Sequence, residues 1–432
     1  MATTSRGDGV LDRSIGVPGA VLLGLGSMVG TGVFVSLHIA GAVTGPSVVL
    51  AVAIAALVAA ANALSSAQLA AAHPVSGGTY EYGYRFLHPA AGFLAGWMFL
   101  LAKSASAATA ALAFAAYLGS LVAVPLGRVP TALLLVLLLL LVTLAGLRRT
   151  TLVNGVIVSI TLGSLLVFVI LAVPAWDAQR LQPFFAPEPG RTPAGALLYA
   201  AALSFVAFTG YGRIATLGEE IREPRRSIPR AIAATVIIVA LLYAMVALAG
   251  AGTVGTSGLG AVALDGGAPL EAAAAALGGP PARLVLALGA LVATQGVLLN
   301  LLLGLSRVLL AMGRRADMPR ITARVAGGTP RVALVLVAAV VAALVLVGDV
   351  RATWSFSAIT VLLYYATANA AALAVSEAER IVPRWVSAAG LVGCLSLAAF
   401  VEVTVLAWGT LAVGSGLAWF AAARVLERKG SS

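Results

Sequence analysis

Long apolar segments follow one another along the whole chain, and this pattern leaves few possible folds. The sequence is 61% hydrophobic and only 10% charged. A segment of about 20 apolar residues crosses a bilayer as one helix. The pattern therefore predicts an all-α, multi-pass membrane protein with about twelve transmembrane helices. The expected spans are 15–44, 46–72, 90–123, 130–147, 151–174, 193–218, 229–253, 283–312, 331–348, 352–374, 384–401 and 403–424.

Lysine and arginine residues are distributed unevenly between the loops that join these spans. With both termini on one side, 20 of the 27 Lys and Arg residues fall on that side and 5 on the other, while Lys103 and Arg213 lie within spans. The positive-inside rule then places both termini in the cytoplasm and the chain in the cell membrane. This distribution argues that the net charge of +11 serves the lipid bilayer and not a nucleic acid.

A glycine-rich stretch, Gly24 to Phe34, lies in the middle of the first apolar segment. Its glycines weaken the helix, and broken backbone within a bilayer is tolerated only where it lines a cavity or packs within protein. A break here would present carbonyl groups to an ammonium and N–H groups to a carboxylate, so one helix could hold a zwitterion. Alternatively, Gly26 and Gly30 form a GxxxG face that packs against another helix.

A second weak point, Phe205 to Arg213, lies about 180 residues after the first. It occupies the matching place in what would be a second unit of five helices. Paired interruptions in corresponding halves of a membrane protein indicate the binding site of a transporter. The pairing therefore favours the binding-site interpretation of the first stretch over simple helix packing.

Two connecting segments are predicted to carry helices of their own. The segment from His73 to Pro89 is polar and aromatic, which is typical of an interfacial helix or hairpin on the cytoplasmic face. The segment from Gly252 to Pro281 contains an alanine-rich run behind Pro269, which predicts a short helix across the outer mouth.

Four ordered sequence blocks resemble the amino acid–polyamine–organocation (APC) permease superfamily. They are Gly26 to Phe34; Pro74 to Tyr80 with Pro89 and Gly92 to Trp97; Phe208 to Tyr211 with Glu219 to Pro224 and Ile228 to Ala231; and Ser306 to Met312 with Asp317 to Pro319. The resemblance implies a LeuT-type 5+5 inverted repeat in which helices 1 and 6 are broken. The expected parts are a cytoplasmic tail (1–14), a transport core (15–374, repeats 15–174 and 193–374), helices 11–12 (375–424) and a cytoplasmic tail (425–432).

The resemblance also implies where a substrate would bind. Its carboxylate would lie on the N–H groups of Gly30, Thr31 and Gly32. Its amine would meet carbonyl groups near Leu25 to Met28 and Phe205 to Phe208, so that backbone dipoles bind both charged ends. The aromatic and small side chains beside the second break would form the wall and the gate, although packing alone also explains them. The candidate binding residues are Gly26, Ser27, Met28, Gly30, Thr31, Gly32, Phe205, Val206, Phe208, Thr209 and Gly210.

Lys103 is predicted to lie roughly 20 Å along helix 3 from Pro89, at 1.5 Å per residue. A lysine at this depth is costly and indicates a function by default. Some relatives place a lysine in helix 5 that stands in for a sodium ion, but the matching position here is Thr161. Lys103 is therefore the candidate for coupling transport to protons, with Thr161 as the second coupling candidate. A salt bridge or a reach to the lipid headgroups is the structural alternative.

Arg213 follows the second break, where many relatives carry an acid one position earlier and this chain has Gly212. Arg213 is expected to pair with Glu219 or Glu220 as a closing latch, or else to line the inner vestibule. Tyr364, Tyr365 and Asn369 in helix 10 are further, weaker candidates for the permeation path.

No catalytic, metal-binding or phosphate-binding motif is present, so an enzyme and a cofactor are not expected. The single cysteine, Cys394, argues against a disulfide-linked partner subunit. We expect a secondary transporter of amino acids that works by alternating access, by proton symport or by exchange. No Asp or Glu falls inside helices 1, 3, 6, 8 or 10 as drawn, which favours neutral, mostly apolar amino acids unless Glu81 or Glu402 folds inward. An amine permease for polyamines or ethanolamine, and a channel or amino-acid sensor on the same fold, are the alternatives.

Overall fold

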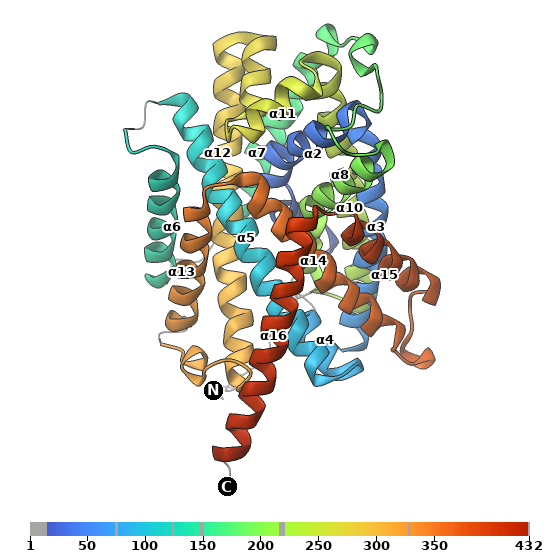
Figure 1. The fold of residues 1–432 in the computed structure, drawn as a ribbon, viewed down its shortest axis with the longest axis vertical. Helices are drawn as coiled ribbons and strands as arrows, with labels where there is room; N and C mark the ends of the chain where they lie inside the picture. Colours follow the sequence, from blue (N-terminus) through green and yellow to red (C-terminus); the bar gives the residue numbers. More distant parts are fainter. Residues whose placement is uncertain are drawn as a thin grey trace, which may run out of the picture.

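The computed structural model describes residues 15–73, 77–122, 125–146, 151–215, 221–326 and 329–430. This part of the chain is helical, and its only β-type pairings are two isolated bridges. Figure 1 shows the helices packed side by side along the long axis. The main helices are α1 (Val17–Met28), α2 (Leu37–Thr44), α3 (Val48–Ala72), α4 (Thr79–Phe86), α5 (Pro89–Leu121), α6 (Arg128–Leu144), α7 (Thr151–Ala172), α8 (Pro193–Phe208), α9 (Gly212–Ala215), α10 (Pro224–Thr253), α11 (Thr256–Leu264), α12 (Pro269–Arg314), α13 (Arg331–Val347), α14 (Val350–Leu373), α15 (Arg384–Ala399) and α16 (Val403–Gly430).

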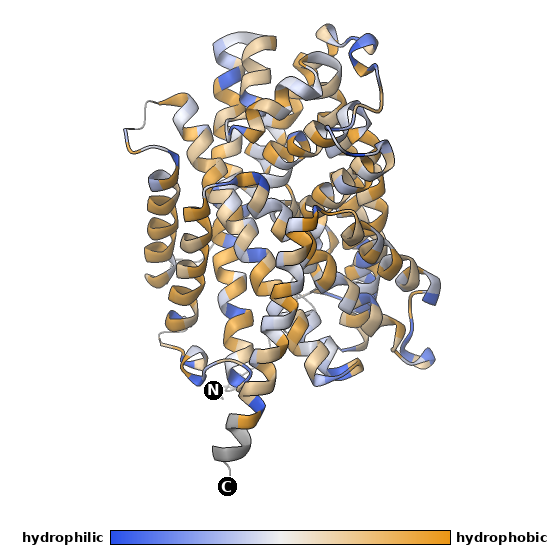
Figure 2. Cartoon of the chain, viewed as in Figure 1, coloured by the Kyte–Doolittle hydropathy of each residue, from blue (hydrophilic) through white to orange (hydrophobic). Residues whose placement is uncertain are grey.

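Each predicted span coincides with one of these helices or with a pair of consecutive ones. Among the described residues, eight helices are long and apolar enough to cross a membrane, and four shorter apolar helices accompany them. The helix α6 leaves four leucines more than half exposed, which suits a lipid environment: Leu134, Leu137, Leu138 and Leu141. Hydrophobic residues dominate α3, α6 and α13 in Figure 2. The all-helical membrane class is confirmed, whereas twelve crossings and the 5+5 repeat stay predictions.

The first predicted break occurs at the centre of the glycine-rich stretch. The helix α1 ends at Met28, and Val29 has extended backbone angles (φ −80°, ψ 103°). The chain then resumes as a wide-turn helix, η1 (Gly32–Ser36), and continues into α2. The interruption thus covers only Val29 and Gly30, whereas Gly24 and Gly26 remain inside α1.

The second predicted break follows α8. There the α-helix gives way to a tight 3₁₀ turn, η5 (Thr209–Tyr211), before α9 begins. The two interruptions pack against each other, and glycines make this approach possible. A Cβ atom on Gly210 would lie 2.3 Å from the carbonyl oxygen of Ser27, and one on Gly32 would lie 2.3 Å from the Cβ of Ala207.

The short helix α4 confirms the helix expected between the second and third spans. Asp317, which follows α12, accepts hydrogen bonds from Tyr80 (2.6 Å) and Tyr84 (2.5 Å) of α4. Burial, reinforced by the Asp317 carboxylate, raises the pKa of both tyrosine hydroxyls, so they remain proton donors. Arg424 of α16 lies 3.5 Å from the same carboxylate. This cluster fixes α4 against the ends of α12 and α16.

The outer segment also contains the helix that the alanine-rich run predicts. The helix α12 begins at Pro269, and its backbone turns sharply at Gly278 and Gly279, where the angles are not helical. The residues from Pro269 to this kink therefore form a separate short helix, beside α11.

The close packing of the two breaks makes a testable prediction about stability. Gly210→Ala would place a methyl group against the backbone of Ser27, and overpacking of this kind costs roughly 1–3 kcal/mol. We expect a lower thermal unfolding midpoint in detergent, measured by intrinsic fluorescence. The control is Gly163→Ala in α7, where no atom lies within 4 Å of the added methyl group. Equal midpoints for the two variants would contradict the observed approach.

Candidate functional site

A cavity of about 490 Å³ lies where the two broken helices meet. Its wall includes both interruptions, one face of α5, and residues of α4, α12 and α14. The predicted site residues that line it are Ser27, Met28, Thr31, Gly32, Lys103, Val206, Thr209, Gly210 and Arg213. Tyr364 and Tyr365, the weaker candidates of α14, line it as well. The structure therefore brings both weak points of the sequence, and the mid-span lysine, to one site.

Polar groups without a partner gather at the first break. Among the described residues, the N–H groups of Gly30, Thr31 and Gly32 donate to no backbone acceptor. The hydroxyl of Thr31 is buried and also lacks a hydrogen-bond partner in this part of the chain. Buried polar groups are normally paired, so an unpaired set beside a cavity indicates a ligand that completes the hydrogen bonds. These groups are donors, which suits an oxygen anion such as a carboxylate.

Tyrosine hydroxyls satisfy carbonyl groups on the other sides of the breaks. The hydroxyl of Tyr243 in α10 lies 2.7 Å from the carbonyl oxygen of Met28 and 3.2 Å from that of Ala207. Tyr365 donates to the carbonyl oxygen of Thr209 at 3.1 Å. The sequence analysis did not single out Tyr243, because a tyrosine within an apolar span carries no signal that separates a hydrogen-bonding role from packing.

Lys103 reaches the second break. Its side chain is 8% exposed, and Nζ donates to Oγ1 of Thr209 at 2.6 Å. The Thr209 hydroxyl in turn donates to the carbonyl oxygen of Val206 at 2.7 Å. Lys103 thus joins α5 to the end of α8, and its contact in the described structure is a neutral hydroxyl. Among the described residues Lys103 makes no ion pair, so this part of the chain gives the salt-bridge alternative no support.

Basic residues dominate the charge of the cavity. Lys103, Arg213, Arg307 and Arg314 line it, and no Asp or Glu of the described residues does so. The two acids that the sequence analysis left open lie elsewhere. Glu81 forms an ion pair with Arg315, Glu402 forms one with Arg351, and neither acid lines the cavity.

Several predicted site residues do not line the cavity. Phe205 packs edge-on against Tyr365, and Phe208 packs edge-on against Tyr243. Gly26 faces Asn154 of α7, and Gly30 faces Val297 of α12. Thr161 is buried and donates to the carbonyl oxygen of Ile157 in its own helix at 2.7 Å. The expected latch cannot be followed, since Glu219 and Glu220 lie outside the described residues, while Arg213 lines the cavity.

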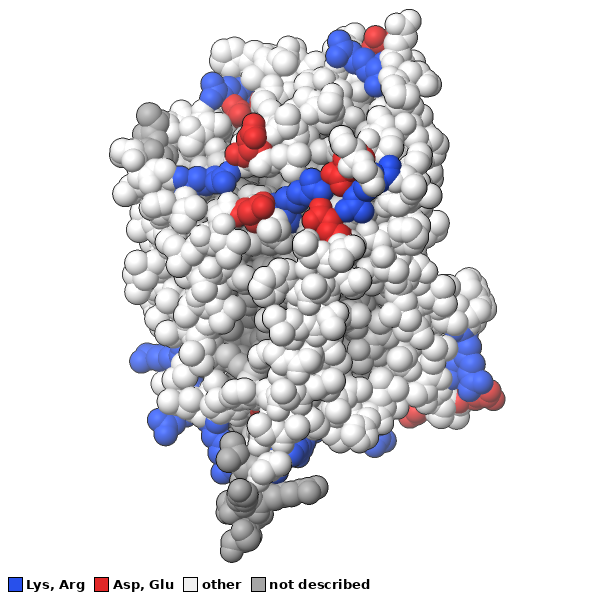
Figure 3. Space-filling model, in the orientation of Figure 1, with Lys and Arg blue, Asp and Glu red and all other residues white. Residues whose placement is uncertain are grey.

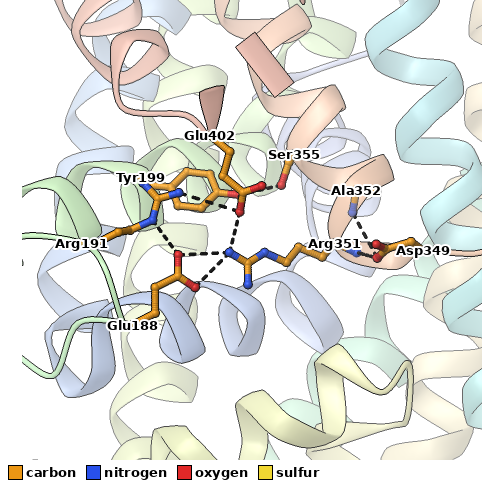
Figure 4. A network of polar contacts seen from close by, with 8 residues as sticks. All are labelled: Glu188, Arg191, Tyr199, Asp349, Arg351, Ala352, Ser355 and Glu402. Atoms are coloured by element: carbon orange, nitrogen blue, oxygen red, sulfur yellow. Dashed lines mark hydrogen bonds and ion pairs between the residues drawn. The ribbon is translucent and has the colours of Figure 1, made fainter. Parts of the chain in front are cut away.

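An ionic network that was not predicted from the sequence joins the segment before α8 to α14 and to the turn before α16 (Figure 4). Glu188 accepts from Arg191 at 2.6 Å and from Arg351 at 2.9 Å. Arg351 also donates to Glu402 at 2.5 Å. Tyr199 of α8 lies 3.1 Å from Glu402 and 2.8 Å from the hydroxyl of Ser355 in α14. We call these six residues the outer network; they connect the segment before α8, α8 itself, α14 and the turn before α16.

The surface charges agree with this arrangement. On the face drawn in Figure 3, acidic and basic side chains mix in an upper band, and mainly basic ones lie at the lower end. Uncharged surface separates the two groups, as in a protein that crosses a bilayer.

Comparison with known proteins agrees with the geometry. The amino acid permease family matches residues 19–427. An uncharacterized transporter of Mycobacterium tuberculosis is 39% identical over 97% of this chain and 93% of its own length. The methylthioribose transporter of Bacillus subtilis is 26% identical over 73% of this chain and 70% of its own. The branched-chain amino acid permease BcaP of the same organism is 26% identical over 74% and 70%.

The match covers nearly the whole chain and confirms the resemblance drawn from the four sequence blocks. Two broken helices around one cavity, together with this match, identify the chain as a member of the amino acid permease family within the APC superfamily.

Proposed function

We propose that this protein is a secondary active transporter that moves amino acids across the cytoplasmic membrane by alternating access. The observation that carries the proposal is the cavity between the two broken helices, where unpaired donors of the first break and the buried Lys103 of α5 come together. An amino acid offers a carboxylate to the N–H groups at Gly30 to Gly32. Its ammonium group fits the carbonyl ends beside Met28 and Ala207, where the second lone pair of each oxygen remains available.

The described arrangement corresponds to a state that is open toward the cytoplasm. The cavity lining continues from the breaks to α4 and to Arg307 and Arg314 near the end of α12, on the side that the charge distribution assigns to the cytoplasm. The outer network joins α8 to α14 at the other end. In a 5+5 repeat, a bundle of helices 1, 2, 6 and 7 would rock against helices 3, 4, 5, 8, 9 and 10. The outer network would then break whenever the outer side opens.

The charge of the cavity bears on the rival substrates. A polyamine or ethanolamine needs an acid in the pocket, and the described lining contains basic residues in place of acids. We therefore place amine permeation second to transport of amino acids without a cationic side chain. A sensor on the same fold would bind the amino acid but would not accumulate it.

Lys103 is the proposed coupling residue. Lys103 lies in the cavity wall and donates to Thr209 of the second break. A substrate bound in the cavity can therefore change the proton affinity of Lys103, and protonation of Lys103 can change the affinity for the substrate. Thr161 bonds within its own helix and offers less support for a coupling role.

The coupling proposal predicts that Lys103→Met abolishes accumulation driven by an inward proton gradient, because the variant has no proton to exchange. The measurement is uptake of labelled amino acids by proteoliposomes, with binding followed separately. The control is Ser106→Ala, which removes a hydroxyl from the same wall without changing charge. Full accumulation by Lys103→Met would exclude the coupling role. Binding without accumulation in the wild type would favour a sensor.

The outer network makes a separate prediction. In a Cys394→Ala background, a reporter, Ala311→Cys, on the cavity wall should react with a thiol reagent supplied from the cytoplasmic side. Glu402→Gln weakens the outer network and should shift the population toward the outward-open state. We expect its reporter to react more slowly, since a loss of about 1–2 kcal/mol from a charge-assisted hydrogen bond lowers the ratio of inward-open to outward-open molecules several-fold.

The matched control for this variant is Glu377→Gln. Glu377 lies 3.8 Å from Arg384 in an ion pair whose side chains are 85% and 62% exposed. Such a pair contributes little, so the reaction rate should stay unchanged. Equal slowing by both variants would show that the outer network has no special role in closure.

A further inference from the structure

We propose that the transported amino acids carry an anionic side chain, and that Lys103 binds this second carboxylate. The inference rests on the proposed function and names its substrate class. It follows from the groups that remain unpaired in the cavity once a zwitterionic backbone is bound.

Lys103 has more hydrogen-bond capacity than the protein uses. An ammonium group has three donors, and here one goes to the Thr209 hydroxyl. The side chain is buried, and among the described residues no carboxylate lines the cavity. A buried ammonium beside neutral partners alone is costly, and a carboxylate removes most of that cost. The cavity therefore favours a ligand that brings an anion to Nζ.

The α-carboxylate of the substrate already has a separate place. Thr31 and Gly32 line the cavity at the first break, where the hydroxyl of Thr31 and the N–H groups of residues 30–32 lack a partner among the described residues, whereas Lys103 contacts the second break. The α-ammonium is matched by carbonyl ends and needs no anion from the protein. Lys103 can consequently bind a group on the side chain of the substrate.

The wall beside Lys103 suits a polar group. Ser106 and Thr209 line the cavity next to it on the same helix and on the facing break. Ser106 lies 2.8 Å from the hydroxyl of Ser357, so this region is held together by hydroxyl groups. An apolar side chain would offer no acceptor to the two donors of the ammonium group that the Thr209 hydroxyl does not use.

The remaining charges act in the same direction. Arg213, Arg307 and Arg314 line the wall toward the cytoplasmic end, and charges of one sign along a cleft raise the local concentration of counter-ions. Among the described residues the charged side chains of the lining are basic, which disfavours a cationic side chain on the substrate and favours an anionic one. This substrate class therefore differs from the neutral, apolar amino acids that the sequence favoured.

The test compares amino acids of matched shape and different charge. Proteoliposomes at equal pH on both sides exchange labelled glutamate, glutamine or lysine against the same unlabelled compound, so that no gradient is needed. We expect the wild type to exchange glutamate roughly tenfold or more faster than glutamine at low concentration, and lysine least. Lys103→Met should reverse the order of glutamate and glutamine, whereas Lys103→Arg, which keeps the charge, should preserve it. Glu377→Gln, which changes a charge in the exposed pair with Arg384, is the control and should also preserve the order.

The outcomes separate the two proposals. Faster exchange of glutamine than glutamate by the wild type would overturn the substrate class and leave amino acid transport intact. Exchange of none of the three would overturn both. If Lys103→Met is inactive toward all of them, Lys103→Arg decides, because loss of the glutamate preference in that variant would also contradict the inference.

Discussion

Interrupted backbone at the centre of a membrane protein needs hydrogen-bond partners, and the rest of this structure depends on how they are supplied. The hydroxyl groups of Tyr243 and Tyr365 donate hydrogen bonds to carbonyl groups beside the two breaks. The N–H groups of the first break have no such partner within the described chain, and Thr31 and Gly32 of this break line a cavity. Because water is excluded from the surrounding lipid, this asymmetry leaves donors for a ligand. The glycines at 32 and 210 allow the two breaks to lie close enough to form one site.

The low polarity of the membrane also limits where charged side chains can lie without a partner. Near both ends of the molecule, acidic residues are matched by arginines, as in the outer network and in the pair of Glu81 with Arg315. Among the described residues, the charged side chains that line the cavity are all basic. If Lys103 binds the side-chain carboxylate, the substrate itself supplies the anion that pairs with it. A proton on Lys103 would then enter and leave together with the anion that stabilises it.

The sequence predicts the helices well, because their lengths and apolar character are set by the bilayer. It also locates both breaks, since glycines in an apolar run have a direct effect on helix continuity. The sequence predicts less well which side chains line the cavity. Phe205 and Phe208 follow the expected helix but turn toward Tyr365 and Tyr243 instead of the cavity. Helix rotation decides which face a residue shows, and an apolar helix has no polar face from which to read that rotation.

Contacts between distant segments escape prediction for a related reason. Lys103 is conspicuous in the sequence, yet its partner Thr209 lies 106 residues away. The outer network joins a loop at Glu188 to a turn at Glu402, and no local pattern connects them. Such pairs depend on the packing of several helices, which periodicity along one segment does not contain.

The central claim is that one cavity between the two breaks holds the substrate by its carboxylate. A density map of the purified protein with a bound amino acid tests this most directly. We expect ligand density against residues 30–32, with the α-carboxylate within hydrogen-bond distance of the Thr31 hydroxyl. Density elsewhere in the molecule, or a ligand in the cavity whose carboxylate points away from this break, would contradict it.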